Sequence, residues 1–541
     1  MTLAAASLLS AALAVSAQVP AAPAENLGKV DFQVSCARAV RADFSRGVAL
    51  LHDFWYDEAK RQFRKIAKAD PNCAMAHWGI ALSTYQQIWD RPDEETLATG
   101  WEEMQKAAAP RAHTAREREY VEALGTFFKP GQKDYQARVD AYSAAMAELY
   151  RRHPDDVDAG AFYALSLLAA QKPDDTSLTQ EHRALAVLNP LFAGNPDHPG
   201  LVHYIIHACD TPSLAPQGLA AAKHYGAIAS SGAHAVHMPG HIFARLGMWR
   251  EDIRDNLASV EASKAAEARH ESDGMDQFHS DDFLLYAFLQ SGAEARAKKI
   301  VDETPGVMSR YEAMPEMTSP FMREMFPYYR NKFPAFYDLE MRDWAAAAVL
   351  EPAPGDQPDN ALVTYWARVV ADGHLRLAQQ AHADFQRHEA LIEQMKRGKN
   401  AYTAQSTGAQ IAHDELVAWV AFADGDQAEA LEHMRLASDL QDKVGQGEVD
   451  IPAREMLADM LLDLHHAAAA LIEYGRALEL SPNRFNGLFN AGRAAEEAGD
   501  RAKAKSYYSA LLESTDNGAH SARREFDHVK AFFSSVQVAS K

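Results

Sequence analysis

The chain has 541 residues, 47% of them hydrophobic, and a formal net charge of −21 at pH 7. This length is more than one compact core holds, so we expect several domains or one elongated repeat array. The acidic balance and the lack of a basic stripe argue against a nucleic-acid binder, and we expect no nucleic-acid partner.

The first segment, residues 1–17, is apolar and consists mainly of small side chains. Its sequence, MTLAAASLLSAALAVSA, ends in Val15-Ser16-Ala17, which fits the small-x-small pattern of a signal-peptide cleavage site. We therefore expect a signal peptide, then a linker over 18–34, and an exported protein that is periplasmic or secreted and soluble after cleavage. No later stretch offers about 20 uninterrupted apolar residues, so we expect no stable membrane insertion.

Small, aromatic and proline residues recur with a 34-residue period at both ends of the chain. In each period, small residues occupy the positions where two helices touch, an aromatic side chain fills the space between them, and proline closes the second helix. The N-terminal copy has Gly47, Tyr56, Ala59, Phe63 and Pro71, and the C-terminal copies have Leu457, Ala458, Ala470, Tyr474, Ala477 and Pro482, then Gly492, Gly499, Ala504 and Tyr508. This pattern resembles the tetratricopeptide repeat family, in the form of an exported bacterial-type protein.

The resemblance implies an all-α fold, a TPR-like solenoid in which helical hairpins stack into a right-handed superhelix. It also implies that the first helix of each hairpin lines a concave groove, which binds a protein or peptide partner. Turn-rich stretches divide the array. We expect N-terminal repeats over 35–170, histidine-bearing middle repeats over 171–300, an irregular connecting region over 301–360, C-terminal repeats over 361–515 and a tail over 516–541.

Two of the three cysteines, Cys36 and Cys73, lie at the start and the end of the first repeat. Export permits disulfides, so we expect this pair to close the repeat covalently. The alternative is two buried thiols. Cys209 is then left as a small buried hydrophobic residue.

The middle repeats carry two histidine pairs with i, i+4 spacing. His203 and His207 stand in HYIIH, His237 and His241 stand in HMPGH, and 34 residues separate the two pairs. Residues four apart share one helix face, with Cβ atoms about 6 Å apart, so one metal ion can bind both imidazoles of a pair. Pro239 interrupts the second pair and places His237 at a helix entrance.

The repeat register places these four histidines at inward positions 5 and 9 of the groove-lining helices. It also places His234 at position 2, and in the next repeat His279 at position 2 and Asp282 at position 5. The first repeat has Phe44 and Val48 at positions 5 and 9, so the histidines are not a general feature of the repeat. We therefore expect one site on the concave face of three consecutive helices, formed by His203, His207, His237, His241, His279 and Asp282.

Imidazole ligands suit zinc, copper or iron, so a bound transition metal is the first interpretation of this cluster. Tyr204 and Met238 occupy the position that glutamate holds in H-E-x-x-H, which argues against a zinc peptidase. The same side chains could instead bind an organic ligand or serve packing alone. Two functions stay open: a binding scaffold that acts through its groove and carries this metal or ligand site, and a metal-dependent enzyme that uses the same histidines for an unassigned reaction.

Overall fold

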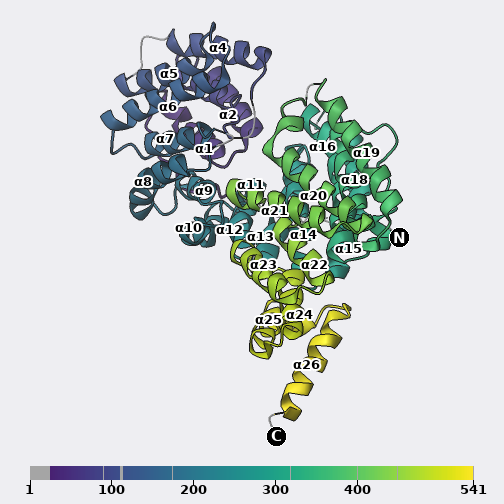
Figure 1. Ribbon diagram of the computed structural model, residues 1–541. Coiled ribbons are helices and arrows are strands. Elements are labelled where there is room, and N and C mark those ends of the chain that lie inside the picture. The colour runs from purple at the N-terminus through teal and green to yellow at the C-terminus, as the bar shows by residue number, and fades with distance from the viewer. Residues whose placement is uncertain are drawn as a thin grey trace, which may run out of the picture.

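A computed structural model describes residues 25–88, 91–109, 114–172, 175–316, 318–398, 400–447 and 449–539 of the chain. All regular elements in these segments are helices, and most pair with a neighbour as hairpins (Figure 1). The all-α, helical-hairpin fold class is therefore confirmed. The predicted signal peptide, 1–17, and the beginning of the predicted linker, 18–24, lie outside the described residues.

The N-terminal part consists of successive hairpins. They are α1 (Arg41–His52) with α2 (Tyr56–Ala69), α3 (Ala74–Leu82) with α4 (Glu94–Ala108), α5 (Ala115–Phe128) with α6 (Tyr135–Arg152), and α7 (Val157–Ala169) with α8 (Thr179–Gly194). Phe63 on α2 shows why the repeat needs small residues. A Cβ atom at Gly47 would lie 2.8 Å from Phe63 Cζ, and one at Gly79 would lie 2.5 Å from Phe63 Cγ. Because both distances are shorter than van der Waals contact, only glycine lets this ring fill the space between α1, α2 and α3.

The first hairpin is closed covalently, as predicted, by a disulfide between Cys36 and Cys73. Cys209 is a buried free thiol. Residues 25–34, which were expected to belong to a linker, run along the hairpins and bury Phe32. The backbone N–H of Asn26 donates to Ser231 Oγ at 2.8 Å, which ties this segment to the middle of the chain.

The middle hairpins hold the predicted site. α9 (Pro199–Ala208) pairs with α10 (Ala215–Ile228), α11 (Ala233–His237) and α12 (Pro239–Arg245) both pack on α13 (Trp249–Ala268), and α14 (Met275–Gln290) pairs with α15 (Glu294–Glu312). The helix break predicted near His237 falls at Met238, where α11 ends and Pro239 begins α12 at a position that needs no N–H donor. In Figure 1, α9 to α13 lie between the N-terminal hairpins and the C-terminal ones.

The interval 301–360 is mostly helical, which corrects the expectation of an irregular region. α15 continues to Glu312, and it is followed by α16 (Pro320–Glu340), α17 (Trp344–Ala347) and the beginning of α18 (Pro358–Leu375). Pro327 and Pro334 lie inside α16. Phe326 and Phe333 on the same helix are buried, and this packing outweighs the local cost of the prolines.

The C-terminal part repeats the hairpin arrangement. α18 pairs with α19 (Ala378–Met395), α20 (Thr407–Asp424) with α21 (Gln427–Val444), α22 (Ala453–Asp463) with α23 (Ala467–Leu480), and α24 (Phe485–Glu497) with α25 (Arg501–Ser514). Short 3-10 helices span Arg38–Val40, Thr403–Gln405 and Asp516–Gly518. The expected tail over 516–541 contains α26 (Glu525–Ala539), which buries Phe526 and Val529. In the part of the chain that the structure describes, no helix is long and apolar enough to span a bilayer.

Candidate metal centre in the middle repeats

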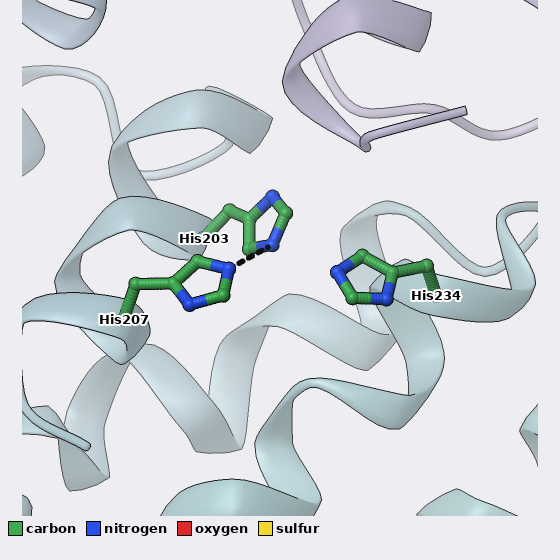
Figure 2. Close-up of side chains that lie close together, drawn as sticks. All are labelled: His203, His207 and His234. Carbon is green, nitrogen blue, oxygen red and sulfur yellow. Dashed lines mark hydrogen bonds between the residues drawn. The ribbon is translucent and has the colours of Figure 1, made fainter. Parts of the chain in front are cut away.

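Three histidines from two helices meet in a first cluster, which we call triad 1: His203 and His207 on α9 and His234 on α11. One ring nitrogen of each lies within 4.8 Å of the others. Figure 2 shows the paired rings of His203 and His207, with the ring of His234 facing them from the neighbouring helix. The Nε2 atoms of His203 and His207 are 3.1 Å apart. The i, i+4 pair therefore converges, and His234, which the repeat register placed on the groove but not among the predicted ligands, completes the group.

A second cluster, triad 2, consists of His237 on α11, His241 on α12 and His279 on α14. Its ring nitrogens also lie within 4.8 Å of one another. The Nε2 atoms of His237 and His241 are 3.0 Å apart, so the pair converges despite the break at Met238. His237 and His241 are buried, whereas His279 is half-buried.

Oxygen acceptors fix the orientation of both rings in the close pair of triad 2. His237 Nδ1 lies 2.6 Å from Asn256 Oδ1, and His241 Nδ1 lies 2.9 Å from Asp210 Oδ2. The amide nitrogen of Asn256 donates to the Asp252 carbonyl at 3.0 Å, which turns the amide oxygen toward His237. Both rings therefore carry their proton on Nδ1. Their Nε2 lone pairs then face each other, an arrangement that needs an extra proton or a metal cation between them.

The His203 ring in triad 1 is oriented in the same way. Its Nδ1 donates to the backbone carbonyl oxygen of His52 at 2.6 Å, so Nε2 is the atom that faces His207. Burial lowers the pKa of His203 to about 3. Burial and the neighbouring histidines also hold the pKa of His234 well below its ordinary value. Both rings are thus neutral at physiological pH, which is the state that binds a metal ion.

The nitrogen spacing in each close pair fits a shared cation. Two imidazole nitrogens bound to zinc at 2.0–2.1 Å with a tetrahedral angle between them lie about 3.3 Å apart. The observed Nε2 separations, 3.1 Å for His203 and His207 and 3.0 Å for His237 and His241, are close to this value. The acceptors on the Nδ1 atoms correspond to the outer hydrogen bonds that hold metal-binding histidines in one tautomer. The residues present therefore fit a transition-metal ion.

Asp282, the predicted carboxylate ligand, belongs to neither triad. It lies one helical turn beyond His279 on α14, is buried, and has its Oδ2 atom 2.6 Å from Lys332 Nζ on α16. Although burial opposes it, the Asp282 carboxylate raises the pKa of Lys332 above its ordinary value. The charge of Asp282 is thus matched by an ammonium group, and this partner lies 50 residues away in sequence.

Two phenyl rings cover the triads. Phe54, in the turn after α1, has its ring centroid 4.3 Å from that of His203 and stacks on His207 and His234. Phe283 on α14 lies 4.7 Å from His237 and 4.9 Å from His241, measured between ring centroids. Each triad therefore has an apolar cover. No pattern in the sequence linked Phe54 to the histidines, because 149 residues separate it from His203.

Behind triad 1 lies a buried group of His52, Asp158 and His198. The Nε2 atoms of His52 and His198 are 3.0 and 3.2 Å from the same oxygen, Oδ1 of Asp158. Burial lowers the pKa of His52 to about 4, while the hydrogen bonds from both histidines outweigh burial and keep the pKa of Asp158 below its ordinary range. These side chains bond to one another and support the His52 carbonyl that orients His203.

No family model and no curated protein sequence matches the chain. Among solved structures, the human IFIT1 dimer with m7Gppp-AAAA aligns at a TM-score of 0.37 and 12% identity, over 81% of this chain and 90% of that one. The P58(IPK) TPR domain aligns at a TM-score of 0.22 and 14% identity, over 71% of this chain and 99% of that one. Naa15/Naa10 bound to HypK-THB aligns at a TM-score of 0.25 and 12% identity, over 92% of this chain and 74% of that one.

Proposed function

We propose that this chain is a metal-binding helical-repeat protein whose middle hairpins hold transition-metal ions in tri-imidazole sites. One observation carries the proposal: the Nε2 atoms of His237 and His241 lie 3.0 Å apart while the Nδ1 atom of each ring bonds to an oxygen acceptor. Each triad offers three imidazole nitrogens, a donor set that suits zinc, copper or iron.

We further propose that the repeat array binds a protein or peptide partner. A cavity of about 530 Å³ lies among the C-terminal hairpins and is lined by aromatic and apolar side chains, including Tyr328, Phe336, Trp366 and Ile392. Trp366 Nε1 donates to Oε2 of Glu415 at 2.8 Å, and burial raises the pKa of Glu415 to about 8. A mostly apolar cavity with a few oriented polar groups is typical of ligand sites, and this one could take an apolar side chain of such a partner.

The Cys36–Cys73 disulfide supports the proposal that the protein works outside the cytosol. Disulfides persist in oxidising compartments such as the periplasm and the extracellular space.

Metal analysis of the purified protein tests the main proposal. The protein is stripped with a chelator, offered Zn²⁺, Cu²⁺ or Fe²⁺ in separate samples, desalted, and analysed by inductively coupled plasma mass spectrometry. We expect it to retain at least one of these metals, and the double variant His237→Ala, His241→Ala to retain less of that metal, because only triad 1 stays complete.

The matched control is His382→Ala, His413→Ala, which removes two exposed histidines of α19 and α20. This control should retain as much metal as the unmodified protein, and all three proteins should have the same far-UV circular dichroism. Equal metal content in both double variants would refute the proposed site.

A further inference from the structure

We infer that triad 1 and triad 2 form one dinuclear centre, in which two metal ions, each bound by three imidazoles, share a bridging oxygen donor such as hydroxide. The inference rests on the proposed metal-binding function. It adds the stoichiometry of the centre and the class of ligand that the centre takes, a small anion able to bridge two cations.

The spacing of the rings is the first argument. Within triad 1, the centroid of His203 lies 4.7 Å from that of His207 and 5.1 Å from that of His234, and His207 and His234 are 6.4 Å apart. Between the triads, His234 and His237 are 6.1 Å apart, and His207 and His241 are 6.4 Å apart. The centroid distances between rings of different triads are thus no larger than the widest centroid distance inside triad 1. The six rings therefore form one continuous cluster.

The second argument is that one short helix serves both triads. α11 spans only Ala233–His237, and it contributes His234 to triad 1 and His237 to triad 2. These residues are three apart, so their Cβ atoms are separated by about 5–6 Å. Two-metal sites in proteins hold their ions about 3.5–4 Å apart, a spacing that neighbouring ligands on one helical turn can provide.

The third argument concerns what surrounds the cluster. Phe54 contacts the rings of triad 1 and Phe283 contacts those of triad 2. His207 and His279, one member of each triad, remain half-buried. Each ion would therefore have three imidazole ligands and still be approachable by a small ligand from the less covered side.

Acidic side chains lie beside both triads. Asp210 bonds to His241 in triad 2, and Asp276 Oδ1 lies 4.0 Å from Nδ1 of His234 in triad 1. A cavity of about 260 Å³ beside triad 1 is lined by Phe54 and by acidic side chains that include Asp57, Asp273 and Asp276.

Copper loading with electron paramagnetic resonance tests the inference. The full-length protein is loaded with Cu²⁺, desalted, and compared with His203→Ala, His207→Ala, which keeps triad 2, and His241→Ala, His279→Ala, which keeps triad 1. We expect two copper ions per unmodified chain and an integrated Cu²⁺ signal far smaller than the copper content, because closely spaced Cu²⁺ spins couple. Each double variant should hold one copper ion with a full mononuclear signal.

Azide provides a second readout on the same samples. Titration followed by its charge-transfer absorption should saturate at one azide per two copper ions in the unmodified protein and at one per copper in each double variant. The electron paramagnetic resonance measurement and the azide titration are repeated on the single variant His207→Gln, which changes the helix less than a double variant does.

The outcomes separate the two proposals. Two copper ions with a full, uncoupled signal, or one copper ion per unmodified chain, would overturn the dinuclear centre and leave the metal-binding function standing. A protein that retains no metal would overturn both. Far-UV circular dichroism and the exposed control His382→Ala, His413→Ala show whether a loss of copper reflects a loss of fold.

Discussion

The backbone carbonyl oxygen of His52 accepts a hydrogen bond of 2.6 Å from Nδ1 of His203, although 151 residues separate them. His52 ends α1 in the first hairpin, whereas His203 lies on α9. The bond holds the His203 proton on Nδ1 and directs Nε2 toward His207. The first hairpin therefore takes part in orienting a ligand of the proposed metal centre.

Replacing the carboxylate that orients His241 tests the outer hydrogen bonds of triad 2. The variant Asp210→Asn removes the charge of the carboxylate that accepts a hydrogen bond from His241 Nδ1 and forms an ion pair with Arg245. We expect zinc affinity to fall about 10–100-fold, as for other outer-sphere partners of metal-binding histidines. Competition with a chromophoric chelator measures the change. Asp302→Asn, at an exposed ion pair with Lys298 on α15, is the control and should leave affinity unchanged.

The buried ring of His52 predicts a pH dependence of stability in the metal-free protein. Its pKa is lowered from 6.5 to about 4 in the folded chain. Between these pH values the unfolded chain binds a proton that the folded chain excludes. The contribution of this ring to the free energy of unfolding is therefore fully retained above pH 6.5. It falls by about 1.4 kcal/mol for each pH unit below 6.5, until the pH reaches the folded-state pKa.

Urea denaturation at pH 7, 6 and 5 measures this slope. His52→Asn should have a slope that is smaller by up to one proton, whereas His382→Asn, at an exposed position, should match the unmodified protein. An unchanged slope in His52→Asn would contradict the assignment to His52.

Two helical glycines, one packed against the ring of Phe63 and one facing open space, should respond in opposite ways to substitution by alanine. A Cβ at Gly79 would lie 2.5 Å from Phe63, while no heavy atom outside its own helix lies within 4 Å of a Cβ at Gly125. Gly79→Ala should lower the free energy of unfolding by about 1–3 kcal/mol through overpacking. Gly125→Ala should raise it by up to about 1 kcal/mol, because alanine is the better helix former. Chemical denaturation of both variants checks the prediction, and equal effects would show that Phe63 can move aside.

The disulfide of the first hairpin predicts a sensitivity to reduction. The double variant Cys36→Ser, Cys73→Ser opens a loop with a sequence separation of 37 residues and should lower the free energy of unfolding by about 2–4 kcal/mol. Dithiothreitol should destabilise the unmodified protein by a similar amount and leave the variant unaffected. Thermal denaturation with and without the reductant makes the comparison.

Sequence periodicity predicted those parts of the site that depend on local spacing. The 34-residue offset identified His203 and His207 with His237 and His241 as equivalent pairs, and both pairs converge in the structure. The register also placed His234 and His279 at position 2 of their helices, and each of them joins one triad. These relationships follow from the helical repeat itself, so the residues alone reveal them.

The interactions that the sequence did not reveal are those between distant segments. Lys332 pairs with Asp282 from another hairpin, and Asn256 reaches His237 from the facing helix, α13. Such contacts depend on how hairpins pack, and no spacing rule predicts them. The helical character of 301–360 was missed for a similar reason, because Phe333 and its neighbours find buried positions that compensate for the prolines.

The carbonyl bond between His52 and His203 has a consequence for how the array unfolds. In a solenoid held together by adjacent units alone, losing a terminal unit shortens the array and leaves distant units intact. Here α1 contacts α9 directly, so the chain closes on itself across several hairpins. Deleting the first hairpin would remove the carbonyl acceptor of His203 and the covering ring of Phe54 together. The first hairpin and the histidine cluster are thus in direct contact. Local unfolding of the first hairpin would therefore disturb the cluster while the hairpins between α2 and α9 are still folded.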